Sequence, residues 1–72
     1  MTSQVFASRL NPLLDRFHFP SGLEDRASTF SEYVHLPRKM ANMMLNGMLL
    51  PRISVVEKIA EELLIDVEEL VE

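Results

Sequence analysis

Residues 27–51 read ASTFSEYVHLPRKMANMMLNGMLLP, and two short amphipathic patterns within them flank a break at residues 34–37. In each pattern, apolar or small residues recur at i, i+3, i+4 and i+7, the spacing that places side chains on one face of a helix. The first set is Ala27, Phe30, Ser31 and Val34, and the second is Ala41, Met44, Leu45 and Met48. We therefore predict two short helices joined by a tight turn, with small residues that let them cross closely.

The opposite face of the second predicted helix contains no acid and carries side chains that donate or accept hydrogen bonds. These are Lys39, Asn42, Met43 and Asn46, with Arg38 immediately before them. The pattern favours a helix-turn-helix at about residues 27–47 whose second helix is presented to double-stranded DNA. The alternative interpretation is that Arg38 and Lys39 are ordinary solvated charges.

Length and composition predict one small domain covering residues 1–72. The chain is 47% apolar and has no cysteine, which excludes disulfides, thiolate zinc sites and cysteine nucleophiles. Its opening, MTSQVF, has neither the basic nor the apolar region of a secretory leader. The longest uncharged run, residues 40–51, is far shorter than the ~20 apolar residues that span a bilayer. We expect a soluble, cytoplasmic protein without a membrane partner.

The net charge of −4 is unevenly distributed along the chain. Residues 33–55 contain three cations (Arg38, Lys39 and Arg52) and no acid, whereas residues 56–72 contain seven acids and one lysine. A local basic face can bind phosphates while an acidic far side keeps the protein soluble and orients its approach.

The flanking segments predict further helices and no strand. Residues 3–17 carry an apolar helical stripe interrupted by Pro12. We favour one helix with a perturbed middle over a fresh start capped by Asn11. Residues 18–24 form a predicted loop, and Asp25 is a predicted N-terminal cap for the next helix.

After the central pair, Gly47 suits the left-handed end of a helix, and Pro51 closes a short connector. A fourth helix follows, with its acids outside. Its predicted buried residues are Ile53, Val56, Ile59, Ala60 and Leu63. Asp66 and Glu69 have capping-box spacing, which predicts a fifth helix. The predicted fold class is all-α with five helices.

Ordered motifs along the chain resemble the Xre/Cro-type helix-turn-helix family of phage repressors and bacterial regulators. Residues 56–70, VEKIAEELLIDVEEL, are similar to the family's "lekIAeaLgVsldeLl". The opening FASRLNPLLDRFHFP is similar to the "FaeRLneLLdeaGfP" of lysogeny-type repressors, and Asn46-Gly47 followed by Pro51 matches the end of the family's third helix.

The resemblance implies a phage-repressor-like domain with helix three in the major groove and a homodimer on a palindromic operator. Family base-contacting positions correspond to Arg38, Lys39, Asn42 and Met43. Phosphate-contacting positions correspond to Ala27, at the expected start of helix two, and Arg52, at the start of helix four. Asn46 is expected to be a helix cap or a contact to a phosphate of the DNA backbone, not a reader of bases.

The chain departs from the family at residues that bear on the turn and on phosphate binding. His35 stands where the family usually has glycine, Pro37 where it has a capping serine or threonine, and Ala27 where it has glutamine.

Two apolar groups have two interpretations each. Met48, Leu49 and Leu50 form either a subunit or partner interface or a run of which two members fold back into the core. Val67, Leu70 and Val71 are expected first in the core and second in dimer contacts.

Met43 and Arg52 also have two interpretations each. Met43 could touch a thymine methyl or another protein, and Arg52 could bind a phosphate or pair with a carboxylate.

No catalytic or metal constellation is present in the sequence: His18 and His35 stand alone, and so do Gly22 and Gly47. We expect no enzyme activity, cofactor or small-molecule substrate. The predicted function is a sequence-specific transcriptional regulator, a dimeric repressor or Cro-like switch of phage or prophage type. The alternative is a protein-interaction module, such as an antitoxin, antirepressor or co-regulator that keeps the fold.

Overall fold

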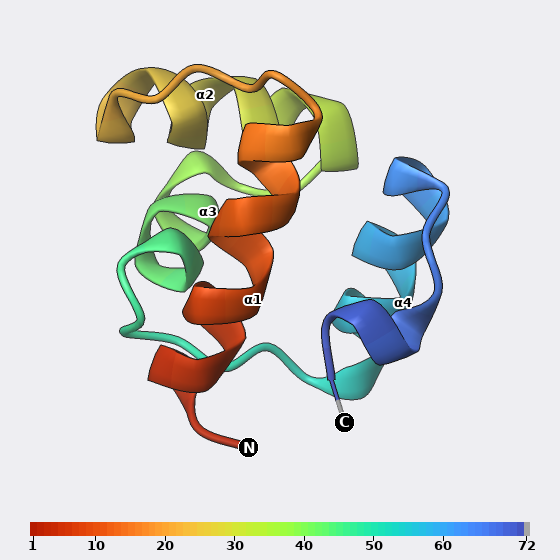
Figure 1. Ribbon diagram of the computed structural model, residues 1–72. Coiled ribbons are helices and arrows are strands. Elements are labelled where there is room, and N and C mark those ends of the chain that lie inside the picture. The colour runs from red at the N-terminus through yellow and green to blue at the C-terminus, as the bar shows by residue number, and fades with distance from the viewer. Residues whose placement is uncertain (72) are drawn as a thin grey trace.

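Four α-helices and one short 3₁₀ turn make up residues 1–71, the part of the chain that the computed structural model describes (Figure 1). The elements are α1 (Ser3–Arg16), α2 (Leu23–Val34), α3 (Arg38–Leu45), α4 (Ile53–Leu63) and the 3₁₀ turn η1 (Val67–Glu69). The all-α class is confirmed, with no strand in the described residues. The predicted fifth helix is wrong, because that segment forms only the three residues of η1.

The first helix is continuous through Pro12, as predicted. Thr2 caps it by accepting a hydrogen bond from the Val5 amide at 3.1 Å. The Asn11 side-chain amide donates at 3.1 Å to the carbonyls of Ala7 and Leu45. The second of these bonds ties the middle of α1 to the end of α3.

All four helices end with the same closure, in which a left-handed residue is followed by an amide that bonds the carbonyl five positions earlier. The left-handed residues are His18, His35, Gly47 and Leu64. The amides of Phe19, Leu36, Met48 and Ile65 donate to the carbonyls of Leu14, Ser31, Met43 and Ala60 at 2.9 to 3.0 Å. The left-handed conformation predicted for Gly47 is confirmed, and the other three positions adopt it with a side chain present.

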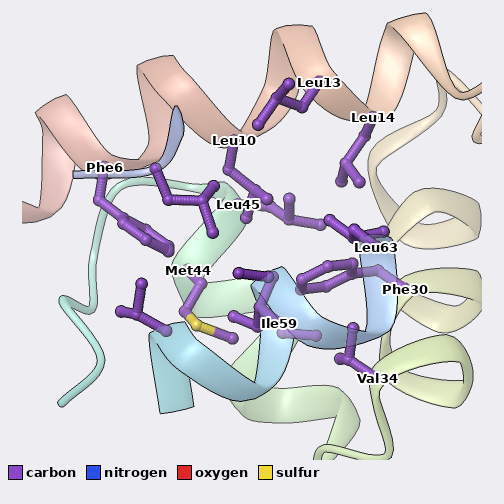
Figure 2. Packing of buried hydrophobic residues seen from close by; sticks show 14 of the residues in the cluster. Phe6, Leu10, Leu13, Leu14, Phe30, Val34, Met44, Leu45, Ile59 and Leu63 are labelled. Atoms are coloured by element: carbon purple, nitrogen blue, oxygen red, sulfur yellow. The ribbon is translucent and has the colours of Figure 1, made fainter. Parts of the chain in front are cut away.

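The core fills the space between α1 and the other three helices (Figure 2). In Figure 1, α2 lies across the C-terminal end of α1, while α3 and α4 lie on either side of it. Small buried residues Ala27, Ser31 and Ala41 lie in α2 and α3, two helices that contact each other extensively. The largest fully buried side chains are Phe6, Phe30, Leu10, Leu14, Met44, Ile59, Leu70, Val34 and Val56.

Two helix starts differ from the prediction. The second helix begins at Leu23 with Gly22 as its N-terminal cap, so Asp25 lies inside the first turn instead of capping it. Glu24 and Asp25 suit that place because negative charge is favourable at a helix N-terminus. Asp66 makes no capping hydrogen bond with its side chain, and the turn that follows is tight enough to bring Leu70 into the core.

Candidate nucleic-acid interface

The turn between α2 and α3 is built on His35, which has φ of +58°. Its amide and the amide of Leu36 both donate to the Ser31 carbonyl. This closes α2, and Pro37 then sets the backbone for the start of α3 at φ −58°. The turn therefore takes the conformation for which glycine is best suited, although the residue there is histidine.

Helix α4 supports this turn from behind. The Lys58 ammonium donates to the His35 carbonyl at 3.3 Å, and the His35 Nε2 lies 3.9 Å from a carboxylate oxygen of Glu62. Both contacts are exposed to solvent, so each is weak by itself. Both contacts join the turn to α4.

Helix α3 separates its side chains onto two faces. Ala41, Met44 and Leu45 are buried against the body of the domain, and Met40 packs partly against it. At 100° per residue, the remaining positions point the other way. Arg38, Lys39 and Asn46 are exposed, and Asn42 and Met43 are half-buried. The five residues expected to face DNA thus share one side of α3.

One hydrogen bond on this face changes what Asn42 offers. The Asn46 side-chain amide donates to the Asn42 side-chain oxygen at 2.5 Å. This bond occupies one of the two acceptor positions of the Asn42 side-chain oxygen. A bidentate grip on adenine needs both the oxygen and the N–H of an asparagine, and the second lone pair of the Asn42 oxygen stays available for it while the bond to Asn46 is kept.

The expected phosphate contact of Ala27 is wrong. Ala27 lies in the second turn of α2 with 0% of its surface exposed, packed in the core. The prediction failed because α2 begins four residues earlier, at Leu23, and so Ala27 is not at the helix start.

Arg52 is exposed at the N-terminal cap position of α4, where no side chain caps the helix. The end of a helix at which amides point outward favours anions. Arg52 also borders a shallow apolar groove of about 350 Å³. The groove is lined by Met40, Leu49, Leu50, Pro51, Arg52 and Val55.

The apolar connector divides between core and surface. Leu49 packs against the core, whereas Met48 is 69% exposed and Leu50 is 42% exposed. Met48, expected in the buried stripe of the third helix, lies beyond its end at Leu45. Ile53, expected to be buried in the fourth helix, is 59% exposed. Three large apolar side chains within six residues of the chain therefore face solvent.

The C-terminal apolar residues belong mainly to the core. Leu70 is fully buried, and Val67 and Val71 pack partly against the core cluster. This agrees with the first of their two expected roles and leaves the dimer contact as a prediction.

The sequence did not predict that Arg26 is buried and holds α2 against α1. Its guanidinium donates to the Pro20 carbonyl at 2.6 Å, to the Asn11 side-chain oxygen at 3.2 Å, and to the Asp15 carboxylate. These bonds attach the start of α2 to α1. Nothing in the spacing of an arginine next to an apolar stripe indicates that its side chain is buried.

Other features of residues 1–71 point to no further chemistry. They contain no group of three or more histidines, cysteines or acids arranged to hold a metal ion, and no helix long and apolar enough to cross a membrane. A second hollow of about 500 Å³ lies between α1 and η1, where Arg16 pairs with Glu69 at 3.1 Å.

Comparison of the chain with protein-family models, with curated proteins and with solved structures gives no match.

Proposed function

We propose that this protein is a sequence-specific DNA-binding transcriptional regulator of the Xre/Cro type, acting as a dimeric repressor or Cro-like switch. The observation that carries the proposal is the composition of the exposed face of α3. That face contains no acid and presents Arg38 and Lys39 in its first turn, although the whole chain has a net charge of −4. Recognition helices reach base edges with residues of that first turn.

Each residue of the face has a role that matches its chemistry. Arg38 would donate two hydrogen bonds to guanine, and Lys39 would donate to guanine or to a phosphate. Asn42 would bind adenine with its amide N–H and its oxygen, or donate its N–H alone to a base acceptor. Met43 would contact a thymine methyl group. Arg52, at the start of α4, would bind a backbone phosphate.

Repression follows from occupancy of an operator, which excludes polymerase from the promoter. One module makes few phosphate contacts, so two copies on a palindromic site are the arrangement expected to give useful affinity.

The test is a titration of labelled duplexes with the full chain at low and moderate salt, with fluorescence anisotropy as the readout. One duplex carries the region upstream of the protein's own gene and the other a random sequence. We expect both to bind at low salt and the upstream region to bind selectively as salt rises. Binding to neither duplex at low salt would refute the proposal.

A protein-interaction module is the second candidate, favoured by the exposed Met48 and Leu50 of the connector. An antitoxin, antirepressor or co-regulator would use that surface while the polar face of α3 stayed solvated. This second candidate would be distinguished by the absence of DNA binding, together with a stable complex with a partner protein that Met48→Gln and Leu50→Gln disrupt.

A further inference from the structure

We propose that Asn46 is a positioning residue for base recognition, whose side-chain amide holds Asn42 in the orientation that reads adenine. Only Asn42 would touch the base, and Asn46 would act through it. This role rests on the proposed function, because it concerns how the exposed face of α3 distinguishes one base from another.

The end of α3 gives Asn46 a fixed place. The carbonyl before it, on Leu45, accepts a hydrogen bond from the Asn11 side chain at 3.1 Å. The carbonyl after it, on Gly47, accepts one from the Ser3 hydroxyl at 2.8 Å. Both donors belong to α1, so the backbone that carries Asn46 is attached to the body of the domain on either side. A side chain on a fixed backbone can orient its neighbour.

Asn46 bonds Asn42 twice across one turn of α3. Its backbone amide donates to the Asn42 carbonyl at 3.0 Å, and its side-chain amide donates to the Asn42 side-chain oxygen at 2.5 Å. Side chains four residues apart are neighbours on a helix surface, so the second bond needs no distortion of the helix. It turns the Asn42 oxygen toward the C-terminal end of α3 and leaves the amide nitrogen on the other side of the planar group.

Adenine recognition requires one order of these two atoms. An asparagine binds adenine by accepting from the N6 amino group and donating to N7. The terminal torsion of asparagine is broad and roughly two-fold, so a half-turn exchanges the oxygen and the nitrogen of an unrestrained side chain. The exchanged amide would place donor against donor and acceptor against acceptor. Asn46 prevents this exchange, while the second lone pair of the Asn42 oxygen remains for the N6 amino group.

The benefit falls on discrimination between bases. Immobilising a free side chain on binding lowers affinity by about 3- to 10-fold, and a side chain that is already held avoids much of that loss. Guanine offers the acceptors N7 and O6 and no donor for the Asn42 oxygen, so it gains less from the same orientation. Asn46 therefore raises the preference for adenine more than the affinity for DNA in general.

A double-mutant cycle on the full chain tests this role by fluorescence anisotropy. Two forms of the preferred duplex carry adenine or guanine at the position that Asn42→Ala no longer distinguishes. We expect Asn46→Ala to lower the ratio of adenine to guanine affinity by about 3- to 10-fold. Asn46→Gln, which keeps an amide donor at the same spacing, should restore most of the ratio. In the Asn42→Ala background, Asn46→Ala should have no further effect on it.

Arg52→Ala is the matched control for the cycle. Arg52 is expected to bind a phosphate, so its loss should weaken binding to both forms equally and leave the ratio unchanged.

A second measurement needs no DNA. NMR relaxation of side-chain amides in the free chain reports their order on the picosecond to nanosecond timescale. We expect the order parameter of the Asn42 side-chain amide to fall below about 0.6, the range of a flexible group, in Asn46→Ala. It should stay near its wild-type value in Asn46→Gln and in Arg52→Ala.

Three results would overturn the role of Asn46. The first is an Asn42 order parameter that Asn46→Ala leaves unchanged. The second is an equal loss of affinity for the two duplexes, which a phosphate contact of Asn46 would give, and the third is a lowered ratio that persists without Asn42. The last two require that the chain binds DNA, so the proposed function would stand. Binding to no duplex at low salt would refute the proposed function and this role with it.

Discussion

Arg38 is the residue whose replacement should separate base reading from phosphate binding. It is exposed in the first turn of α3, with no acid on the same face. Removing a bidentate contact to guanine costs about 1–3 kcal/mol of discrimination. We predict that Arg38→Ala weakens binding to the preferred site about 5- to 150-fold, and binding to random duplex only a few-fold, as measured by fluorescence anisotropy.

Arg16→Ala is the control, because Arg16 is an exposed cation on α1 that pairs with Glu69. It should leave both affinities nearly unchanged. An equal loss on preferred and random DNA for Arg38→Ala would show that Arg38 only clamps a phosphate.

His35 should be replaceable by glycine with a gain in stability. A residue with a Cβ is strained by roughly 1–2 kcal/mol in the left-handed conformation. Glycine removes this strain, but part of the gain in stability is lost because glycine raises the conformational entropy of the unfolded chain. We predict that His35→Gly raises the free energy of unfolding by about 0.5–1 kcal/mol. In a domain of this size the midpoint of thermal unfolding should rise by about 2–8 °C.

Gly47→Ala is the reverse experiment at the next helix end. It places a Cβ at φ of +73° and within 3.4 Å of Gln4, so we expect a loss of about 1 kcal/mol or more. Should His35→Gly destabilise the protein, the contacts of the imidazole with Glu62 would outweigh the backbone strain.

At the scale of single residues, the sequence predicted which residues share a helix face better than it predicted where each helix begins and ends. The polar face of α3 was predictable because helical spacing alone puts residues 38, 39, 42, 43 and 46 together. Ala27 and Met48 were misplaced, since each lies near a helix boundary and the boundary moved by several residues. Burial of Arg26 depends on partners in α1 and in the α1–α2 loop that no local pattern reveals.

At the scale of elements, the attachment of α2 to α1 depends on Arg26. Its side chain is 7% exposed, and its guanidinium bonds Pro20, Asn11 and Asp15. Hydrogen bonds to a charged group contribute about 1.5–3 kcal/mol, and Pro20 and Asn11 would lose their partner. We predict that Arg26→Met lowers the free energy of unfolding by about 2 kcal/mol in urea denaturation.

Asp15→Asn provides the comparison, because it removes only the ionic part of the network. The Asp15 side chain is 65% exposed, so water replaces much of what is lost and the decrease should stay within about 1 kcal/mol. If the two variants were equally destabilised, the ion pair and not the carbonyl bonds would hold α2 in place.

The helices themselves were predictable where an apolar stripe ran for three turns or more, as in α1 and α4. The fifth element was not. Capping-box spacing at Asp66 and Glu69 predicts a helix start, but the backbone there forms one 3₁₀ turn and Asp66 makes no side-chain cap. Leu70, at the end of this turn, is fully buried, and its burial depends on tertiary packing that local spacing does not encode.

At the scale of the whole molecule, charge distribution limits how strongly binding can depend on salt. Residues 33–55 offer three cations per copy, and the remaining chain is acidic overall. Each phosphate neutralised contributes a slope of about −0.9 to the log–log plot of affinity against salt, so two copies should give a slope no steeper than about −5. Anisotropy titrations at four or five salt concentrations measure it.

A steeper slope would mean that cations outside residues 33–55, such as Arg9 or Arg16 on α1, also reach the backbone. The fold class and the position of the basic face followed from the sequence at this scale. The packing of η1 against the core and the exposure of the connector could not be predicted from the sequence. Both depend on which of several apolar residues are buried in the folded core.

Helix α3 has only eight residues, and a segment that short is not helical alone in water. The part of the molecule that would meet a partner therefore exists only while the entire domain is folded. A damaging substitution deep in the core, such as Phe30→Ala, would then mimic a binding defect: fewer competent molecules, each with unaltered selectivity. Any binding measurement on such variants must be divided by the folded fraction before it says anything about recognition.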